Sequence, residues 1–410
     1  MNPQPTCPHI AQRPVRFGVI GIHGYSRQHL AFLQAAARRR PERVELVAAY
    51  AHAREQDPAW AEKLEAQGLH LTGSLDELLG GHRLDVVTVP TGIALHVPLA
   101  RRVLEAGLTP YVEKPAAGTV ELVQELIDAG RRAGRMVFVG FQECFRPSTR
   151  VVKQILLEQR YGGLKRIVST SAWPRPASYY ARNNWAGRLH VGQDTVLDSP
   201  LNNACSHFMN LPLFLAGQSP EQTARPVSLE AELYRANPIE SFDTCGLRVR
   251  TETGCEIVFH ASHACQTPRG PRIRIECERA RILLDFRGPG DQPDWQIQPL
   301  HGPAQSIPRD PGHELPFEHV ADWLSGQTDT PVFTAEQALA HTQVVNAAHR
   351  ACPIRTVDAG HCMSIELKGE AATAIHGMDD LLQTCYERAC LLGEACTAAW
   401  IGPPGRGGCC

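Results

Sequence analysis

A lysine between a glutamate and a proline is the first feature of this sequence that suggests chemistry. Glu113-Lys114-Pro115 follows TPYV, an apolar run typical of a buried strand. Pro115 has a fixed φ and no amide hydrogen, and it favours an extended backbone at Lys114, which would then point into a ligand crevice at the strand's carboxyl end. The ammonium could stabilise negative charge on an oxygen, or transfer a proton if burial lowers its pKa. The alternative is an exposed lysine beside a turn.

The loop GVIGIHGYS, residues 18–26, has the composition of a dinucleotide-binding turn with one substitution. Gly21 and Gly24 are present, and Ser26 is small enough for the position where the helix packs close to the strand. His23 stands where a glycine would let a phosphate approach the backbone, although an imidazole can itself donate to phosphate. The amides and the positive end of the following helix would also attract an anion. The alternative is a strand-to-helix turn without a ligand.

The end of the second predicted strand bears on the choice of nucleotide. In AAYAHAREQ, residues 48–56, no acidic side chain stands where the ribose hydroxyls of NAD would be bound. His52 and Arg54 follow, and an arginine there favours the additional phosphate of NADP. The alternative is that Arg54 is a solvated surface charge.

A second polar group lies in VLDSPLNNACSH, residues 196–207, where a helix over 201–217 is predicted. Ser199 and Pro200 form a suitable N-cap and first turn. The helix would carry a polar stripe at the spacing i, i+3, i+4, i+7, made of Asn203, Ser206, His207 and Asn210. The stripe could face a cleft and offer His207 as a base, or it could hydrogen-bond to the backbone of its own domain.

Two further regions carry weaker indications. Residues 171–188, SAWPRPASYYARNNWAGR, combine Trp, Tyr, Arg and Asn as a carbohydrate site does, but exposed loops have the same composition. His260 and His263 fall in one predicted strand and would point to opposite faces, so we expect no metal site there.

The elements that must position these residues alternate between strand and helix from residue 15 to 141. Strands are expected at 15–21, 44–51, 85–90, 109–114 and 135–140, and helices at 27–39, 57–67, 96–107 and 119–134. Ser74 or Asp76 could cap a further short helix. Strict alternation predicts a doubly wound sheet of parallel strands.

After residue 141 the pattern changes to one helix, 147–163, and then long β-runs joined by tight turns, which indicates an antiparallel sheet. The runs are 164–173, 226–236, 244–253, 254–264 and 272–286, and later helices are expected near 317–324, 335–351 and 378–392. The terminus PPGRGGCC is expected to be loose. We therefore predict a tail (1–14), a Rossmann domain (15–141), an α+β domain with a large, mostly antiparallel open sheet (142–359) and a C-terminal extension (360–410).

Composition restricts the class of partner. The chain has 410 residues, of which 43% are hydrophobic and 20% charged, with a formal net charge of −2. These values argue against a disordered chain or a nucleic-acid-binding surface and favour a small ligand. We expect no secretory leader, no membrane-spanning helix and a cytoplasmic location, and we expect most of the 14 cysteines to be reduced.

Three stretches together resemble the glucose-fructose oxidoreductase and inositol dehydrogenase family, Gfo/Idh/MocA: GVIGIHGYSRQH, DVVTVPTGIALHVPLARRVLEAG and PYVEKPAAGTVEL. Their order and spacing match over residues 15 to about 150. The resemblance implies that NAD or NADP is bound and that Lys114 lies near the nicotinamide and the reacting hydroxyl. The implied cofactor-binding residues are Gly21, His23, Gly24, Tyr25, Ser26, Pro90, Thr91, His96, Glu113 and Lys114.

The family's other signature is an aspartate followed four residues later by a histidine. Asp198 matches, but Asn202 stands at the histidine position, and the next histidine is His207. Asparagine cannot exchange a proton near neutral pH. We therefore predict that Lys114, Asp198, Asn202 and His207 are the catalytic residues; Asp198, Asn202 and His207 would orient the hydroxyls or relay the proton, and His207 could be a substitute base.

The resemblance implies an NAD(P)-dependent oxidoreductase that acts on a secondary alcohol of a sugar, polyol or related cyclic compound. Two alternatives stay open: a family member that recycles bound NAD for epimerisation, elimination or glycoside cleavage, and a non-catalytic sugar-sensing or assembly protein. We expect a small-molecule partner, no nucleic acid or membrane partner, no metal and, because open sheets form subunit contacts in this family, a homodimer or homotetramer.

Overall fold

The computed structural model describes residues 13–286, 293–310, 312–330 and 333–409, so most of the predicted tail lies outside the described residues. The chain divides into two compact units. Unit 1 comprises residues 1–145 and 312–339, and unit 2 comprises residues 146–311 and 340–410.

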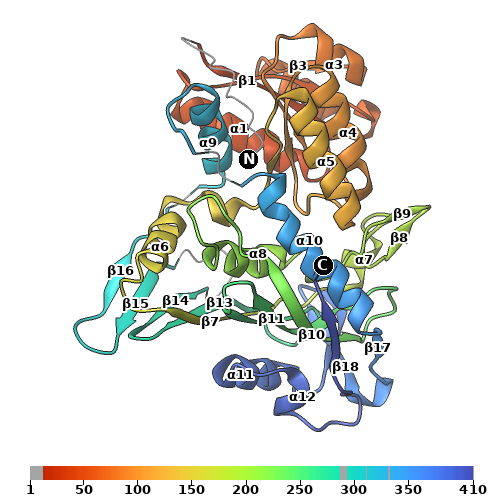
Figure 1. Ribbon diagram of the computed structural model, residues 1–410. Helices are drawn as coiled ribbons and strands as arrows, with labels where there is room; N and C mark the ends of the chain where they lie inside the picture. Colours follow the sequence, from red (N-terminus) through yellow and green to blue (C-terminus); the bar gives the residue numbers. More distant parts are fainter. Residues whose placement is uncertain (1–12, 287–292, 311, 331–332, 410) are drawn as a thin grey trace. The chain divides into compact units, whose positions relative to one another are not determined.

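Unit 1 is built on a parallel sheet of six described strands in the order β3-β2-β1-β4-β5-β6 (Figure 1). The strands are β1 (Val15–Ile20), β2 (Val44–Tyr50), β3 (His70–Thr72), β4 (Val86–Val89), β5 (Thr109–Val112) and β6 (Phe138–Val139). The helices include α1 (Ser26–Arg39), α2 (Pro58–Ala66), α3 (Leu75–Gly81), α4 (Ile93–Glu105), α5 (Val120–Ala133) and α9 (Leu315–Leu324). The predicted doubly wound fold is confirmed.

The two faces of this sheet are covered by different helices, because strand residues alternate in direction. Phe17 of β1 packs against Phe317 of α9, with ring centroids 6.2 Å apart. Ile20 of the same strand belongs to an apolar cluster with Leu75 and Leu78 of α3. Helix α9 is attached to the end of α1 by ion pairs: Arg39 pairs with Glu314 and Glu318, and Arg40, directly after α1, donates two hydrogen bonds of 2.8 Å to Asp322.

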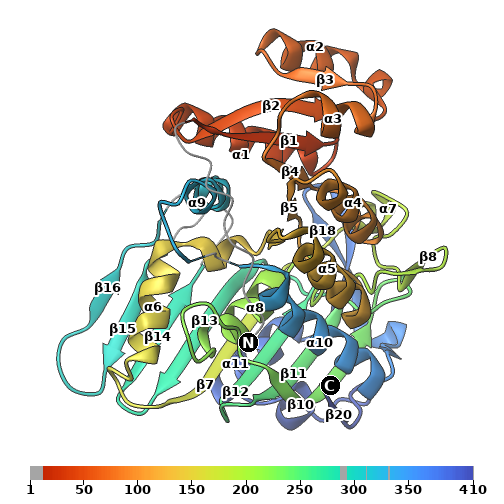
Figure 2. The same cartoon turned by 45° about the horizontal axis from the view of Figure 1, so that its top comes forward.

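Unit 2 contains a larger sheet whose main path runs β16-β15-β14-β13-β7-β12-β11-β10-β17 (Figure 2). Its strands are β7 (Leu164–Ala172), β10 (Pro226–Arg235), β11 (Thr244–Thr251), β12 (Glu256–Ser262), β13 (Arg269–Cys277), β14 (Ala280–Asp285), β15 (Trp295–Pro299), β16 (Gln305–Ile307) and β17 (Arg355–Thr356). Most pairs are antiparallel, as predicted, but β7 pairs in parallel with β12. The predicted run 272–286 is two strands, β13 and β14, joined by a turn.

Helices lie on both faces of this second sheet (Figure 1). Helices α6 (Pro147–Leu157) and α8 (Ser206–Leu215) lie on one face, and α11 (Met378–Arg388) lies on the other. Helix α10 (Ala335–Ala351) is predicted correctly. Helix α8 begins at Ser206 rather than at residue 201, because residues 200–205 form turns in which Cys205 N donates to Pro200 O.

The C-terminal residues differ from the prediction of a loose terminus. Gly405–Gly408 form β20, which adds antiparallel to β10, and Cys409 is buried. The edge of the sheet thus supplies hydrogen-bond partners that local composition does not reveal. None of the described cysteines forms a disulfide, as expected. Across the described residues, no helix is long and apolar enough to cross a membrane.

Candidate functional site

The glycine loop of unit 1 turns directly from β1 into α1. Gly21 has φ +95°, and its amide donates to Tyr50 O at 2.9 Å. Ser26 is buried and donates from Oγ to Ile20 O at 3.2 Å, so the small third residue packs the helix onto the strand. A Cβ on Gly21 would lie 2.7 Å from Ser26 Oγ. The turn therefore needs a glycine at position 21 and a small residue at position 26.

The His23 side chain does not cap α1. Its Nε2 lies 3.0 Å from Ala53 O, beyond the end of β2. No side chain caps α1, and within the described chain the amides of His23, Gly24 and Tyr25 have no hydrogen-bond partner. Gly24 is exposed with φ +57°, and Tyr25 is also exposed. Open amides at a helix N-terminus fit the phosphates of a dinucleotide.

A buried pair beneath the loop joins α1 to the end of β5. His29 Nε2 lies 3.0 Å from Glu113 Oε1, and Glu113 Oε2 accepts a hydrogen bond of 3.0 Å from the amide of Lys114. The charge of Glu113 chiefly raises the pKa of Tyr25. The sequence reasoning did not single out His29. The helical spacing could have indicated that His29 is buried, because it stands four residues before the apolar Leu33 on the same face of the helix.

His96 joins two of the predicted cofactor-binding segments. It is buried, with Nδ1 2.8 Å from Pro115 O and Nε2 3.1 Å from Thr91 O. Burial chiefly lowers the pKa of His96, and the nearby charge of Lys114 also lowers it. Both partners are carbonyl acceptors, so a neutral His96 ring, which has one N–H, donates to one of them and packs against the other. Pro90 is buried at the end of β4.

Two side chains at the carboxyl ends of β4 and β5 are suited to contact a ligand. Thr91 Oγ1 is buried without a hydrogen-bond partner in the structure. Lys114 is half-buried at the end of β5. An orphaned hydroxyl, open helix amides and an ammonium at the carboxyl ends of neighbouring parallel strands fit a nicotinamide dinucleotide.

Arg54 is not available as an isolated phosphate ligand. Its Nη1 and Nη2 donate to Glu65 Oε1 and Oε2 at 2.8 and 2.6 Å, and this pairing raises its pKa. The guanidinium therefore has a carboxylate partner on α2. This contact weakens the argument for NADP that the sequence suggested.

The second predicted group lies in unit 2, before and in α8. Asp198 is buried and accepts hydrogen bonds from Gly187 N at 2.6 Å and Asn203 Nδ2 at 2.8 Å. Asn202 Nδ2 donates to Val196 O at 3.0 Å, which leaves Oδ1 buried without a protein partner. His207 is half-buried on the first turn of α8. The structure thus joins Asp198 to Asn203 and places Asn202 and His207 on the same chain segment, whereas Lys114 belongs to unit 1.

Residues 171–188, predicted as a loop, are partly regular: Ser171 and Ala172 end β7, and Ala177–Ala181 form α7. Guanidinium groups of the same segment contact its aromatic rings. Arg182 and Arg175 lie over the ring of Tyr179, at 3.6 and 4.7 Å from its centroid. Trp173 Nε1 donates to Gly270 O at 3.0 Å. The ring of Tyr179 is therefore already covered by cations.

Comparisons with known proteins match both units. Residues 15–141 match the family described as "Oxidoreductase family, NAD-binding Rossmann fold", and residues 149–283 match the "GFO/IDH/MocA C-terminal domain". An uncharacterized oxidoreductase of Rhizobium meliloti is 34% identical over 123 residues, 30% of this chain and 35% of that protein. A myo-inositol dehydrogenase of Streptomyces leeuwenhoekii is 30% identical over 126 residues, 30% of this chain and 38% of that protein. The match thus spans little more than a third of these two relatives.

Among solved structures, the WlbA dehydrogenase from Bordetella pertussis, in complex with NADH and UDP-GlcNAcA, is similar with a TM-score of 0.66 and 23% identity. The similarity covers 82% of this chain and 96% of that chain. At this identity the match supports the fold.

Proposed function

Because the chain belongs to the GFO/IDH/MocA oxidoreductase family, whose first domain is an NAD-binding Rossmann fold, we propose that it oxidises or reduces a secondary alcohol of a sugar, polyol or related cyclic compound. The cofactor, NAD or NADP, would accept or supply the hydride. One observation carries the proposal. The uncapped N-terminus of α1 follows β1, and Lys114 follows β5, so both stand after the carboxyl ends of strands in one parallel sheet.

The residues that would hold the cofactor form two groups. The loop residues Gly21, His23, Gly24, Tyr25 and Ser26 would surround the diphosphate. Pro90, Thr91 and Glu113 would line the crevice, and the orphaned Thr91 hydroxyl would gain a partner there. In this proposal His96 is a positioning residue, because both of its ring nitrogens face backbone carbonyls.

Lys114 would act on the reacting oxygen. Its ammonium would stabilise the developing alkoxide, or its neutral amine would take the proton that the alcohol loses. Asp198 keeps a fixed orientation through Gly187 and Asn203, so it would accept a hydrogen bond from a substrate hydroxyl. Asn202 Oδ1 would accept another, because the amide nitrogen is already used by Val196 O. His207 would be the exchangeable base near neutral pH.

The test is a screen of sugars and polyols with NAD and NADP on the wild type, Lys114→Ala and Lys114→Arg. We expect Lys114→Ala to lower kcat/KM by about 10²–10⁴-fold, with nucleotide affinity changed only a few-fold. Nucleotide that remains bound through purification, without net turnover, would instead favour a recycling reaction such as epimerisation, elimination or glycoside cleavage. Binding of a sugar without turnover or nucleotide binding would favour a sugar-sensing protein.

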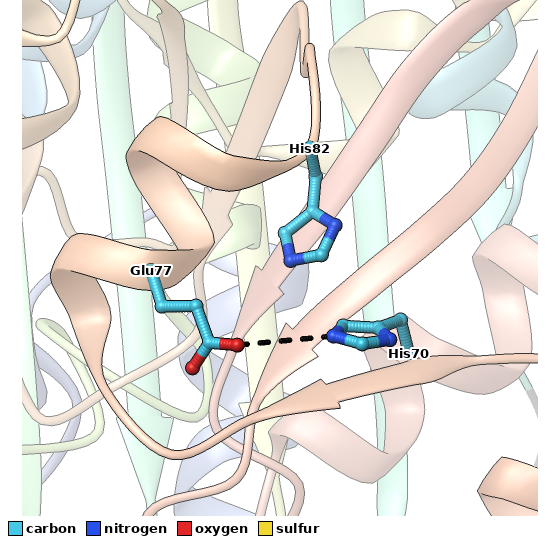
Figure 3. Close-up of side chains that lie close together, drawn as sticks. All are labelled: His70, Glu77 and His82. Carbon is cyan, nitrogen blue, oxygen red and sulfur yellow. Dashed lines mark ion pairs between the residues drawn. The ribbon is translucent and has the colours of Figure 1, made fainter.

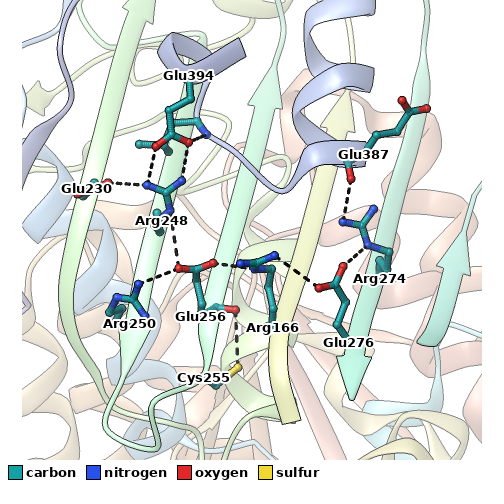
Figure 4. Close-up of polar contacts among 11 residues, drawn as sticks. Arg166, Glu230, Arg248, Arg250, Cys255, Glu256, Arg274, Glu276, Glu387 and Glu394 are labelled. Atoms are coloured by element: carbon teal, nitrogen blue, oxygen red, sulfur yellow. Dashed lines mark hydrogen bonds and ion pairs between the residues drawn. The ribbon is translucent and has the colours of Figure 1, made fainter. Parts of the chain in front are cut away.

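We also propose a homodimer or homotetramer formed through the large sheet of unit 2. Beside α12 (Leu392–Ala395) this sheet carries arginine and glutamate side chains on adjacent strands (Figure 4). Arg248 pairs with Glu230 at 2.7 Å, and Arg250 pairs with Glu256 at 3.1 Å. A surface with both charges in alternation can pair with a copy of itself. Light scattering at low salt should give two or four chains per particle, and a single chain would contradict this assembly.

A further inference from the structure

Two histidines and a glutamate converge at the edge strand of the sheet in unit 1. His70 begins the edge strand β3, Glu77 lies in α3, and His82 follows that helix. All three occur within HLTGSLDELLGGH, residues 70–82. The strand, the turn and the helix together bring the three side chains to one place.

Their ligand atoms point into one common space (Figure 3). One potential ligand atom from each of His70, Glu77 and His82 lies within 4.8 Å of the other two. His70 Nε2 is 3.9 Å from Glu77 Oε1, and the two imidazole rings are 4.5 Å apart between centroids. Around a tetrahedral Zn²⁺ with bonds of about 2.1 Å, ligand atoms lie about 3.4 Å apart. Movement of about 1 Å, within reach of the exposed His70 and Glu77 side chains, would close the site.

Backbone contacts already orient the carboxylate. Ser74 caps α3 by accepting from the amide of Glu77 at 3.1 Å, as one of the two predicted caps. Glu77 Oε2 accepts a hydrogen bond of 3.2 Å from Gly73 N, which leaves Oε1 directed at the histidine. Such outer contacts are what hold metal-binding side chains in position.

The imidazole of His82 is suited to be a ligand. Its Nε2 is buried and has no hydrogen-bond partner in the structure. A neutral imidazole offers a nitrogen lone pair that a metal ion can accept. A divalent ion would give the orphaned nitrogen its partner.

We propose that His70, Glu77 and His82 bind one Zn²⁺, with water completing a tetrahedral site. Two imidazoles and one carboxylate form a ligand set of the kind that zinc prefers. Bound zinc would link the edge strand β3 to the end of α3 and so protect the sheet edge from fraying. This inference does not depend on the proposed redox function.

The test uses the full chain, stripped of metal with a chelator, and titrated with Zn²⁺ by calorimetry and by thermal unfolding. We expect one equivalent to bind and to raise the Tm. His70→Ala, His82→Ala and the nearly isosteric Glu77→Gln should each weaken this binding by more than about tenfold, since even outer contacts are worth 10–100-fold. His301→Ala, an exposed histidine in unit 2, is the matched control and should bind as the wild type does.

Cobalt identifies the ligands independently, because this chain also has many cysteines. Co²⁺ bound to two histidines and a glutamate should show d–d bands without the near-ultraviolet thiolate charge-transfer band. A thiolate band, unchanged zinc affinity in the three site variants, or no binding by the wild type would each overturn the proposal.

Discussion

At the scale of single residues, the structure explains how a histidine can stand in a dinucleotide loop. The His23 side chain turns towards Ala53 O, and the positive φ that the turn requires falls on Gly24 instead. The amides at the start of α1 consequently stay open. The sequence could predict the helix and the loop, but not the direction of the imidazole, because Ala53 lies 30 residues away.

Arg54 gives a prediction about nucleotide choice. Glu65→Gln would remove the carboxylate that accepts both guanidinium hydrogen bonds. The released guanidinium could then bind the additional phosphate of NADP, since arginine and phosphate form bidentate pairs. We expect the ratio of NADPH to NADH affinity to rise several-fold, measured as two dissociation constants on the same preparation. An unchanged ratio would mean that Arg54 does not approach the nucleotide.

The buried pair beneath the loop gives a second prediction. His29 and Glu113 are both buried, and removing one partner leaves a buried charge with fewer contacts. His29→Ala should therefore lower the free energy of unfolding by about 3 kcal/mol. Urea unfolding followed by fluorescence would measure this change, and Gln28→Ala, on an exposed position of the same helix, is the control.

At the scale of elements, the C-terminal segment depends on a buried acid. Glu232 of β10 accepts hydrogen bonds from Leu392 N at 2.8 Å and Gly393 N at 2.9 Å, and so holds α12 on the sheet. Burial chiefly raises the pKa of Glu232 to about 7. The folded protein therefore binds this proton more tightly than the unfolded chain does.

The consequence is a pH dependence of defined sign. The contribution of Glu232 to the free energy of unfolding is greatest below its ordinary pKa of 4.5 and falls as the pH rises to about 7. Above that pH the contribution stays lower, and the full loss is about 3 kcal/mol. Glu232→Gln stays neutral, so its unfolding free energy should vary less between pH 5 and 8 than that of the wild type. Urea unfolding at both pH values decides this, and equal slopes for the two proteins would contradict it.

Periodicity predicted most of the elements but not their partners. The alternation of strand and helix up to residue 141 was sufficient for the doubly wound sheet, because each parallel strand is an apolar run. The start of α8 was wrong because residues 200–205 use turn hydrogen bonds, and the terminus was wrong because β20 pairs with β10 across more than 170 residues. The contacts of α9 with Phe17 likewise cannot be inferred from local pattern.

At the scale of the whole molecule, the residues proposed for catalysis come from both compact units. Lys114 stands at the end of a parallel strand in unit 1, and Asp198, Asn202 and His207 stand before and in α8 of unit 2. Family resemblance linked the two groups, since nothing in their spacing alone does so. The proposed roles of these side chains require a bound nucleotide, because the nucleotide would be the oxidant or reductant of the reaction.

Binding of the nucleotide is therefore the most direct test of the account. The full chain should be titrated with NADH and with NADPH while the nicotinamide fluorescence is recorded. Our account predicts saturable binding of at least one of them, with one equivalent per chain. If neither nucleotide binds, the open amides at the start of α1 do not form a dinucleotide site, and the proposed redox function is wrong.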